Sequence, residues 1–384
     1  MKVREERVLK ALSHLRPDRT PLFEIFQPYQ PIHWDICGRT IATDAAKAWD
    51  AMAEGVPKEE FVEASAQAQF RICRFFELDM VRLTGCGYID GIRPLKTGTG
   101  RWTVNGVPYV FNEKTKLVHP ENPIHSYSQQ ISEEDLTKKI ESWDEKVDTS
   151  VELDPVLNRV KELAHADGID WVYMAEIGAG TGVAFYPPFM LMWMLEKPEI
   201  YLRWMEMQKA SAFESTRQMI QQGCRVVAMG GDVSCDKGPF ISPALYRKFI
   251  LPVIREHVDL IHSMGAFAVY TSDGNHWLIK DDFFFNSGID GYKEVDRSAG
   301  MTWEMLMAEG VADRICIIGN IDARYTMCNA STDAVEREVE ECLNYGLKAR
   351  GGHILHLSHS VHEDVKVENY HALVKTYRRF FGIS

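Results

Sequence analysis

The sequence predicts an α/β protein, and within that class a single closed (β/α)8 TIM barrel. Two observations predict this fold. Eight short apolar runs rich in β-branched residues recur along the chain, and helix-like stretches with a 3.6-residue period lie between most of them. Near-continuous apolar runs are typical of parallel strands that are buried on both faces. An open, doubly wound sheet with an additional domain is the structural alternative.

The expected elements follow one another in regular order. A helix is expected at 2–12, where it would close the bottom of the barrel ahead of the first strand. Strands are expected at 22–26, 80–83, 171–175, 226–229, 267–271, 289–292, 315–318 and 354–357. Helices are clearest at 57–76, 198–222, 242–264, 331–349 and 367–381. Ser331-Thr332-Asp333 supplies an N-cap for the fourth of these helices.

The long gap between the second and third strands holds an insertion. Residues 98–118 contain the turn dipeptide Asn105-Gly106 within a strand-like stretch, which predicts a β-hairpin. No linker, repeat or low-complexity tract divides the chain. We therefore expect one domain over 1–384, with the hairpin on the barrel rim.

Composition excludes several classes of partner. The chain of 384 residues has 43 Lys and Arg against 55 Asp and Glu, a net charge of −12, which disfavours nucleic acid and anionic membranes. Its eight cysteines form no CxxC pair and most lie in apolar runs, which is typical of reduced thiols. No signal peptide and no transmembrane helix is apparent, so a cytoplasmic location is expected.

In a (β/α)8 barrel the catalytic residues come from the carboxyl ends of the strands, and here those ends are rich in polar residues. A purely structural barrel would not need such groups in a half-buried mouth, so their concentration favours an enzyme. Asp232 after two glycines and Glu176 are strong candidates, whereas Asp and Asn at such positions also cap helices. Glu24 stands in an apolar run and is either paired or active. The full set is Glu24, Gln27, Thr84, Cys86, Glu176, Asp232, Ser272, Asp273, Asn275, Lys293, Glu294, Asp296, Asn320, Asp322, His356, His359 and His362.

The last strand carries four histidines at a spacing of three: His353, His356, His359 and His362. One strand end cannot point all of them at one centre, so one or two at most are ligands, and His359 is the best candidate. Asp273 and His359 with a further carboxylate could hold a metal such as zinc. The alternative is that these histidines are hydrogen-bonded structural residues.

Two other features also have two interpretations. The segment Gly178-Ala179-Gly180-Thr181-Gly182 lacks GxGxxG spacing, which favours a substrate-covering loop over a dinucleotide cradle. Aromatic residues near the strand ends could line an apolar pocket or belong to the core. These include Phe26, Tyr29, Tyr270 and Trp277.

Several motifs resemble those of the uroporphyrinogen decarboxylase superfamily, whose fold is a (β/α)8 barrel. They span nearly the whole chain. They are Arg7-Val8-Leu9-Lys10-Ala11-Leu12 followed by Pro17-Asp18-Arg19-Thr20-Pro21, Gly231-Asp232-Val233 leading to Ile241-Ser242-Pro243, Tyr270-Thr271-Ser272-Asp273-Gly274-Asn275, and Gly319-Asn320-Ile321-Asp322.

Departures from this pattern bear on activity. The decarboxylases carry an Arg-Gln-Ala-Gly-Arg-Tyr segment that grips carboxylates, whereas this chain reads Phe26-Gln27-Pro28-Tyr29-Gln30-Pro31 there. The thiol-methylating branch binds zinc through His-x-Cys and a later Cys, positions held here by Thr271, Asp273 and His359. The resemblance therefore implies a corrinoid-dependent methyltransferase that takes a methyl group from a phenyl methyl ether, in O-demethylation. The alternative is a decarboxylase-like lyase acting on a carboxylated substrate, and a non-catalytic binding protein is disfavoured.

The resemblance also implies roles and partners. The catalytic residues would be Asp232, Glu176, Asp273 and His359: one of the three carboxyl groups, or a metal held by Asp273 and His359, would assist the leaving phenolate. Glu24, Phe26, Tyr29, Tyr270, Asn275 and Trp277 would hold the small methylated donor. Zinc at Asp273 and His359 is a further option. Cobalamin would arrive on a partner corrinoid protein, because the chain shows no Asp-x-His-x-x-Gly motif, and the oligomeric state stays open.

Overall fold

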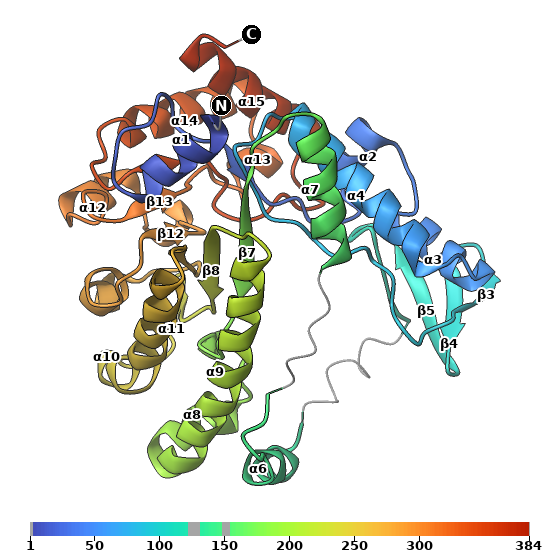
Figure 1. The fold of residues 1–384 in the computed structure, drawn as a ribbon, viewed down its shortest axis with the longest axis horizontal. Coiled ribbons are helices and arrows are strands. Elements are labelled where there is room, and N and C mark those ends of the chain that lie inside the picture. Colours follow the sequence, from blue (N-terminus) through green and yellow to red (C-terminus); the bar gives the residue numbers. More distant parts are fainter. Residues whose placement is uncertain (1–2, 122–130, 148–153, 384) are drawn as a thin grey trace.

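The barrel is closed and built from eight parallel strands. The computed structural model describes residues 3–121, 131–147 and 154–383, and its main sheet has the order β1-β2-β7-β8-β11-β12-β13-β14 (Figure 1). A bridge between Leu22 and Leu355 joins the last strand to the first, with Phe23 N donating to Leu355 O at 3.0 Å. The predicted (β/α)8 barrel is therefore confirmed. The strands are β1 (Phe23–Glu24), β2 (Met80–Val81), β7 (Val172–Ile177), β8 (Val226–Gly230), β11 (Phe267–Thr271), β12 (Gly291–Lys293), β13 (Cys316–Ile318) and β14 (His353–Ile354).

Helices cover the outside of the barrel, and all five predicted ones are present. Ser331 caps α14 as expected, since its Oγ accepts from Ala334 N at 3.4 Å. The predicted helix 242–264 contains a π-helical turn at Tyr246–Ile250. Pro252 follows this turn and lacks the backbone N–H that a continuous α-helix would use there. The helices around the barrel are α2 (Pro31–Cys37), α4 (Lys58–Phe75), α6 (Glu133–Glu141), α7 (Pro155–Ala166), α8 (Pro188–Glu196), α9 (Pro198–Gln221), α10 (Pro243–Leu245), α11 (Leu251–Ser263), α12 (Trp303–Ala308), α13 (Thr326–Asn329), α14 (Thr332–Gly346) and α15 (Val367–Phe381).

The N-terminal helix α1 (Val3–Leu12) plugs the barrel, as the sequence predicts. Its Val8, Ala11 and Leu12 are almost fully buried and form one apolar cluster with inward-facing strand residues. This cluster fills the end where the strands begin, so the polar mouth lies at the opposite end. The strand residues in it are Phe23, Ile25, Met80, Val172, Met174, Val226, Ala228, Val269, Cys316, Ile318 and Ile354.

Ion pairs of the buried Arg7 anchor this plug. Arg7 of α1 is 5% exposed and donates to both carboxylate oxygens of Asp18, at 2.8 and 2.7 Å. It also contacts Asp79, which is fully buried and accepts from Leu22 N at 3.0 Å. The plug is thus tied to the starts of β1 and β2.

The rim insertion is larger than predicted. Asn105 (φ 49°) and Gly106 (φ 82°) form the expected hairpin turn between β4 (Arg101–Val104) and β5 (Val107–Asn112). Two flanking strands, β3 (Leu95–Gly98) and β6 (Leu117–Pro120), extend the hairpin to a four-stranded antiparallel sheet. The prediction of 98–118 missed β3 because its side chains are mostly exposed and show no apolar alternation.

The insertion has a small core of its own. Helix α3 (Ala45–Glu54) packs on the sheet through Trp49, whose ring centroid lies 5.7 Å from that of Trp102 and 4.9 Å from that of Tyr109.

All eight cysteines are free thiols, of which Cys235 is exposed. In the part of the chain that the structure describes, no helix is long and apolar enough to cross a membrane.

Candidate active site at the barrel mouth

Neighbouring strands β7, β8, β11 and β12 deliver acidic side chains to one end of the barrel. Glu176 is the last residue but one of β7. Asp232 follows β8, Asp273 follows β11 and Glu294 follows β12. His359, in the loop after β14, is close enough to affect the pKa values of Asp232, Asp273 and Glu294. The four residues predicted to be catalytic therefore lie at the same end of the barrel.

A close backbone crossing positions Asp232. A Cβ atom on Gly231 would lie 2.2 Å from Gly182 N, so the loops after β7 and β8 can meet there because both residues are glycine. Ala184 N donates to Asp232 O at 3.0 Å, and Thr181 Oγ1 donates to Gly230 O at 3.0 Å. The glycine-rich loop 178–182 thus braces the Asp232 loop, a structural task that the sequence did not suggest.

Crowding of carboxylates alters their protonation. Burial, with the nearby Asp273 and Glu294, raises the pKa of Asp232 to about 6. Burial and Glu294 also raise the pKa of Asp273. A group with a pKa near neutrality can donate and accept protons at the operating pH, so Asp232 is a candidate general acid.

A buried lysine organises the floor of the mouth. Lys293 is 0% exposed, and its Nζ lies 2.8 Å from Glu294 Oε1 and 4.0 Å from Glu176 Oε1. Arg82 Nε lies 3.0 Å from the other oxygen of Glu176, Oε2. Burial disfavours ionisation of Glu294, but Lys293 and His359 outweigh it, so the pKa of Glu294 is lowered.

Arg82 was not among the predicted residues, and Lys293 and Glu294 were given no role in the predicted site. Lys293 and Glu294 were recognised as polar strand ends, and only their contacts distinguish them from residues that cap helices. Arg82 stands two residues after Met80, which faces the barrel interior. That period of two is the signal that would have found it.

A cleft of about 710 Å3 opens at the mouth. Asp273 and His359 line it, together with Arg324, whose Nη1 lies 3.3 Å from Asp236 Oδ2. Lys114, from the turn between β5 and β6, lines it as well. The rim insertion therefore forms one wall of this cleft.

The predicted donor-binding aromatics lie behind the mouth. Phe26 packs between barrel and helices, with its ring centroid 5.7 Å from that of Phe76 and 5.4 Å from that of Tyr370. Tyr270 is 1% exposed, packs on Phe283 and donates from its hydroxyl to Gly231 O at 3.4 Å. Both side chains support the mouth without lining its cleft.

Tyr29 and Trp277 have comparable structural roles. Tyr29 packs against the core of the insertion, where burial raises the pKa of its hydroxyl to about 12. Trp277 Nε1 donates to Gly300 O at 3.0 Å, and Asn275 Nδ2 donates to Ala299 O at 2.9 Å. Asn275 and Trp277 thus tie the loop after β11 to the loop after β12.

The remaining candidates are paired with other groups of the protein. Glu24 and His356 are almost fully buried, and Glu24 Oε1 lies 2.8 Å from His356 Nδ1. His353 Nε2 donates to Gly319 O at 2.7 Å, and His362 Nε2 lies 3.8 Å from Cys328 Sγ. Of the four histidines, His359 is the exposed one.

A zinc site does not fit the residues present. Over residues 3–121, 131–147 and 154–383, no three His, Cys, Asp or Glu side chains are grouped so that they could hold a metal ion. Asp273 and His359 line the same cleft, but two ligands do not make a zinc centre.

A closed barrel with ionisable groups at the carboxyl ends of its strands belongs to the (β/α)8 barrel proteins. The family profile "Uroporphyrinogen decarboxylase (URO-D)" matches residues 128–380, and the chain belongs to this family. It is 26% identical over 157 residues to uroporphyrinogen decarboxylase of Colwellia psychrerythraea, which covers 37% of this chain and 41% of that protein. It is 30% identical over 138 residues to the Serratia proteamaculans enzyme, covering 34% and 35%.

The chain thus matches about two fifths of the length of these curated relatives. A solved structure, a methyltransferase from Methanosarcina mazei, superposes with a TM-score of 0.63 at 18% identity, covering 98% of this chain and 99% of that one. This likeness shows a shared fold along the whole chain.

Proposed function

We propose that the chain is a corrinoid-dependent methyltransferase. It would move a methyl group from a small methylated donor, specifically a phenyl methyl ether, to cob(I)alamin on a corrinoid protein. The observation that carries the proposal is Asp232, a half-buried carboxyl at the barrel mouth whose pKa is raised to about 6. Membership of the URO-D family and the fold shared with a methyltransferase support it.

The leaving group explains why a proton donor matters. A phenolate leaves poorly from carbon unless its oxygen is protonated, and a phenol has a pKa of about 10. Proton transfer from a carboxyl group of pKa about 6 to a phenolate oxygen is favourable by roughly four pKa units. Cob(I)alamin, when bound, supplies the nucleophile that accepts the methyl group.

Asp232 and Glu294 have different roles in the proton transfer. As the bond between the methyl carbon and the ether oxygen breaks, Asp232 gives its proton to that oxygen and becomes a carboxylate. Glu294 stays ionised beside Lys293, and its negative charge increases the fraction of Asp232 that is protonated before the reaction. Solvent at the barrel mouth then returns a proton to Asp232, and a neutral phenol is the product.

The charge distribution disfavours the lyase alternative. A porphyrinogen carries many carboxylates, which need free cations. Arg82 and Arg324 at the mouth are already paired with Glu176 and Asp236. Residues 26–31, where the decarboxylases place arginines, contain none.

Anaerobic absorbance spectroscopy tests the proposal. Reduced cob(I)alamin, free or on a corrinoid protein, is mixed with the chain and a panel of methoxylated phenols. Loss of the cob(I) band with growth of a methyl-cob(III) spectrum is expected, and Asp232→Asn should slow it by about 100-fold, a typical contribution of general acid catalysis. Asp273→Ala and His359→Ala should also impair it.

A matched control sharpens this experiment. Asp364 is exposed and lines the cleft beside Asp273 and His359, but the proposal gives it no role, so Asp364→Asn should retain the rate. An equal loss in Asp232→Asn and Asp364→Asn would contradict the assignment of Asp232. If no ether in the panel methylates a competent corrinoid partner, while uroporphyrinogen loses carboxyl groups, measured as porphyrins with fewer carboxylates after oxidation, the lyase interpretation replaces ours.

A further inference from the structure

Helix α8 is apolar on two opposite faces. Every residue from 188 to 195 is apolar. One face is buried against the rest of the protein and consists of Met190, Trp193 and Met194. Trp193 Nε1 also donates to Glu133 Oε1 of α6 at 2.9 Å, so this face fixes α8 in place.

The opposite face of α8 is open to solvent. Its residues follow one another at i, i+3, i+4 and i+7, which places them in one stripe along the helix. This α8 stripe consists of Pro188, Leu191, Met192 and Leu195. Met192 is 47% exposed and Leu195 is 64% exposed. A helix that is apolar on all sides is normally buried on all sides, so the stripe is a surface for a partner to cover.

The α8 stripe belongs to the mouth end of the molecule. Figure 1 shows α8 at the opposite end from α1, which fills the barrel where the strands begin. Helix α8 starts four residues after Ala184, whose backbone N–H donates to Asp232 O at 3.0 Å. A macromolecule that brings a methyl acceptor to Asp232 approaches from this end and meets α8.

Negative charge borders the α8 stripe. Glu196 ends α8 and Glu199 lies in the first turn of α9, and both side chains are exposed. Among the residues that the structure describes, no cation forms an ion pair with either of them. Lys197 lies between them in the sequence, but its Nζ is 2.7 Å from Glu133 Oε1. The border therefore keeps a net negative charge.

This border discriminates between possible occupants. In a twofold dimer, a second copy of the chain would place stripe on stripe and bring both sets of carboxylates together, which is unfavourable. The negative surface of an anionic membrane would be repelled in the same way. A protein whose apolar surface is flanked by lysine or arginine matches both the stripe and its border.

We propose that the α8 stripe docks the protein that carries the corrinoid. This inference rests on the proposed function, in which the methyl acceptor arrives on a protein. In the complex, Met192 and Leu195 pack on an apolar surface of the carrier, and Glu196 and Glu199 face its basic side chains. The apolar contact supplies affinity, whereas the charges steer the carrier and orient it.

Steady-state kinetics with two acceptors test the proposal. The acceptors are free cob(I)alamin and the corrinoid protein that proves competent in the spectroscopic assay above, with a methoxylated phenol as donor. Met192→Glu/Leu195→Glu puts two charges into the apolar contact, so KM for the corrinoid protein should rise at least about tenfold with kcat retained. The rate with free cob(I)alamin should stay unchanged, because that acceptor needs no docking surface.

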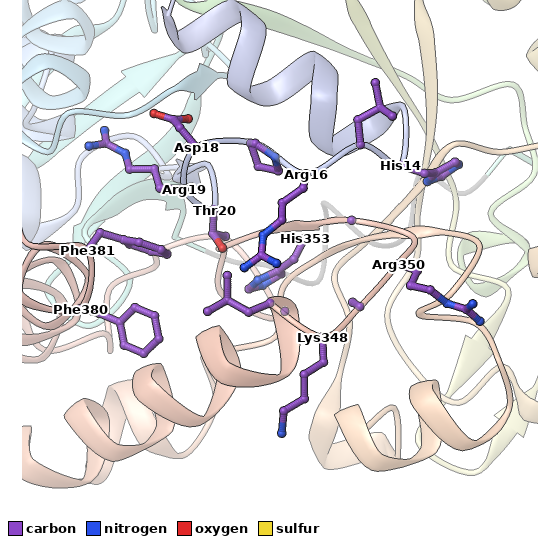
Figure 2. A pocket seen from close by; sticks show the side chains of 16 residues that line it. His14, Arg16, Asp18, Arg19, Thr20, Lys348, Arg350, His353, Phe380 and Phe381 are labelled. Carbon is purple, nitrogen blue, oxygen red and sulfur yellow. The ribbon is translucent and has the colours of Figure 1, made fainter.

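The matched control makes the same two substitutions elsewhere. Met305 of α12 and Leu347 at the end of α14 are likewise more than a third exposed. Leu347 lines the cavity that Figure 2 shows, together with residues 14–20 between α1 and β1. Met305→Glu/Leu347→Glu should therefore leave KM for the corrinoid protein and the rate with free cob(I)alamin unchanged.

A second variant tests the border of the stripe. Salt screens the attraction between the acidic border and a basic carrier, so KM for the corrinoid protein should rise with ionic strength. Glu196→Gln/Glu199→Gln removes two of the charges and should make this rise smaller. An equal dependence on salt in the variant and the unaltered chain would contradict a basic partner surface.

Three results would overturn the docking proposal as a whole. The first is an unchanged KM for the corrinoid protein in Met192→Glu/Leu195→Glu, and the second is an equal rise in the control. The third is a dimer of the unaltered chain, measured by sedimentation velocity, that the stripe variant abolishes, because a second copy would then cover the stripe. Transfer to free cob(I)alamin but to no corrinoid protein would also overturn docking and leave the methyl-transfer chemistry intact, whereas methylation of neither acceptor would refute the proposed function itself.

Discussion

The two ends of the barrel both contain buried charged groups, but they balance them differently. At the closed end, Arg7 and Arg19 meet Asp18 and Asp79, two cations against two carboxylates. At the mouth, Arg82 and Lys293 pair with Glu176 and Glu294, whereas Asp232 and Asp273 form no ion pair within the described residues. A balanced network holds elements together, whereas an excess of carboxylates leaves one of them ready to carry a proton.

The largest effect is expected at the closed end. Arg7→Met leaves the carboxyl group of Asp79 fully buried without its close partner, which typically costs about 3–5 kcal/mol of unfolding free energy. Urea unfolding at neutral pH measures this loss. A loss below about 1 kcal/mol would mean that the closed end does not depend on its ion pairs.

At the mouth, Lys293→Met should impair activity. Without the lysine, buried Glu294 takes up a proton and no longer repels ionised Asp232, so the pKa of Asp232 falls. The active, protonated form of Asp232 is then lost at lower pH, and the rate at pH 7 should drop by about tenfold. The pH–rate profile of methyl transfer measures the shift.

The conservative variant Lys293→Arg keeps the positive charge and serves as the control. Its descending limb should stay close to pH 6, where Asp232 titrates. An unshifted limb in Lys293→Met would show that Lys293 does not act on Asp232.

A smaller effect on stability is expected from Asp232→Asn, and it should depend on pH. The pKa of Asp232 is raised to about 6 in the fold, so its stabilising proton is present below the unfolded pKa of 3.8 and is lost as the pH rises through 6. Asparagine carries no such penalty, so the variant should gain about 1 kcal/mol at pH 8 after allowance for partial exposure. Thermal unfolding at pH 8 and pH 4 measures the difference, and an equal gain at both values would contradict it.

The smallest effect is expected for an exposed ion pair. Arg159 Nε lies 2.7 Å from Glu63 Oε2, with both side chains more than a third exposed. Because solvent screens such pairs, Glu63→Gln should change the unfolding midpoint by no more than about one degree. A change as large as that of Arg7→Met would remove burial as the reason for the difference between the networks.

The fold could be predicted because its signal is local. Buried parallel strands require apolar runs at regular spacing, and each of the eight runs coincides with a barrel strand; Phe267–Thr271 does so residue for residue. The helix α1 was expected at the closed end and fills it. Strand β3 was not predicted because its side chains are mostly exposed and show no apolar alternation that would indicate pairing with β4.

The site could be predicted less well because it depends on side-chain direction. Asp232, Asp273 and His359 follow strands, and a strand end is enough to place them at the mouth. Tyr270 stands on a strand too, but it points outward to Phe283, and only the phase of the strand decides that. The ion pair between Lys293 and Glu176 joins the nonadjacent strands β12 and β7. No pattern within the sequence predicts a contact between residues so far apart.

The plugged barrel also constrains how the chain reaches its folded state. Leu22, next to the first strand, pairs with Leu355, more than three hundred positions away in the sequence. Helix α1 packs against side chains from strands all around the barrel. Contacts of such high contact order form late and fold slowly. Until they form, β1 and β14 are unpaired edges, so a nascent or heat-opened chain would expose the surface through which β-proteins aggregate.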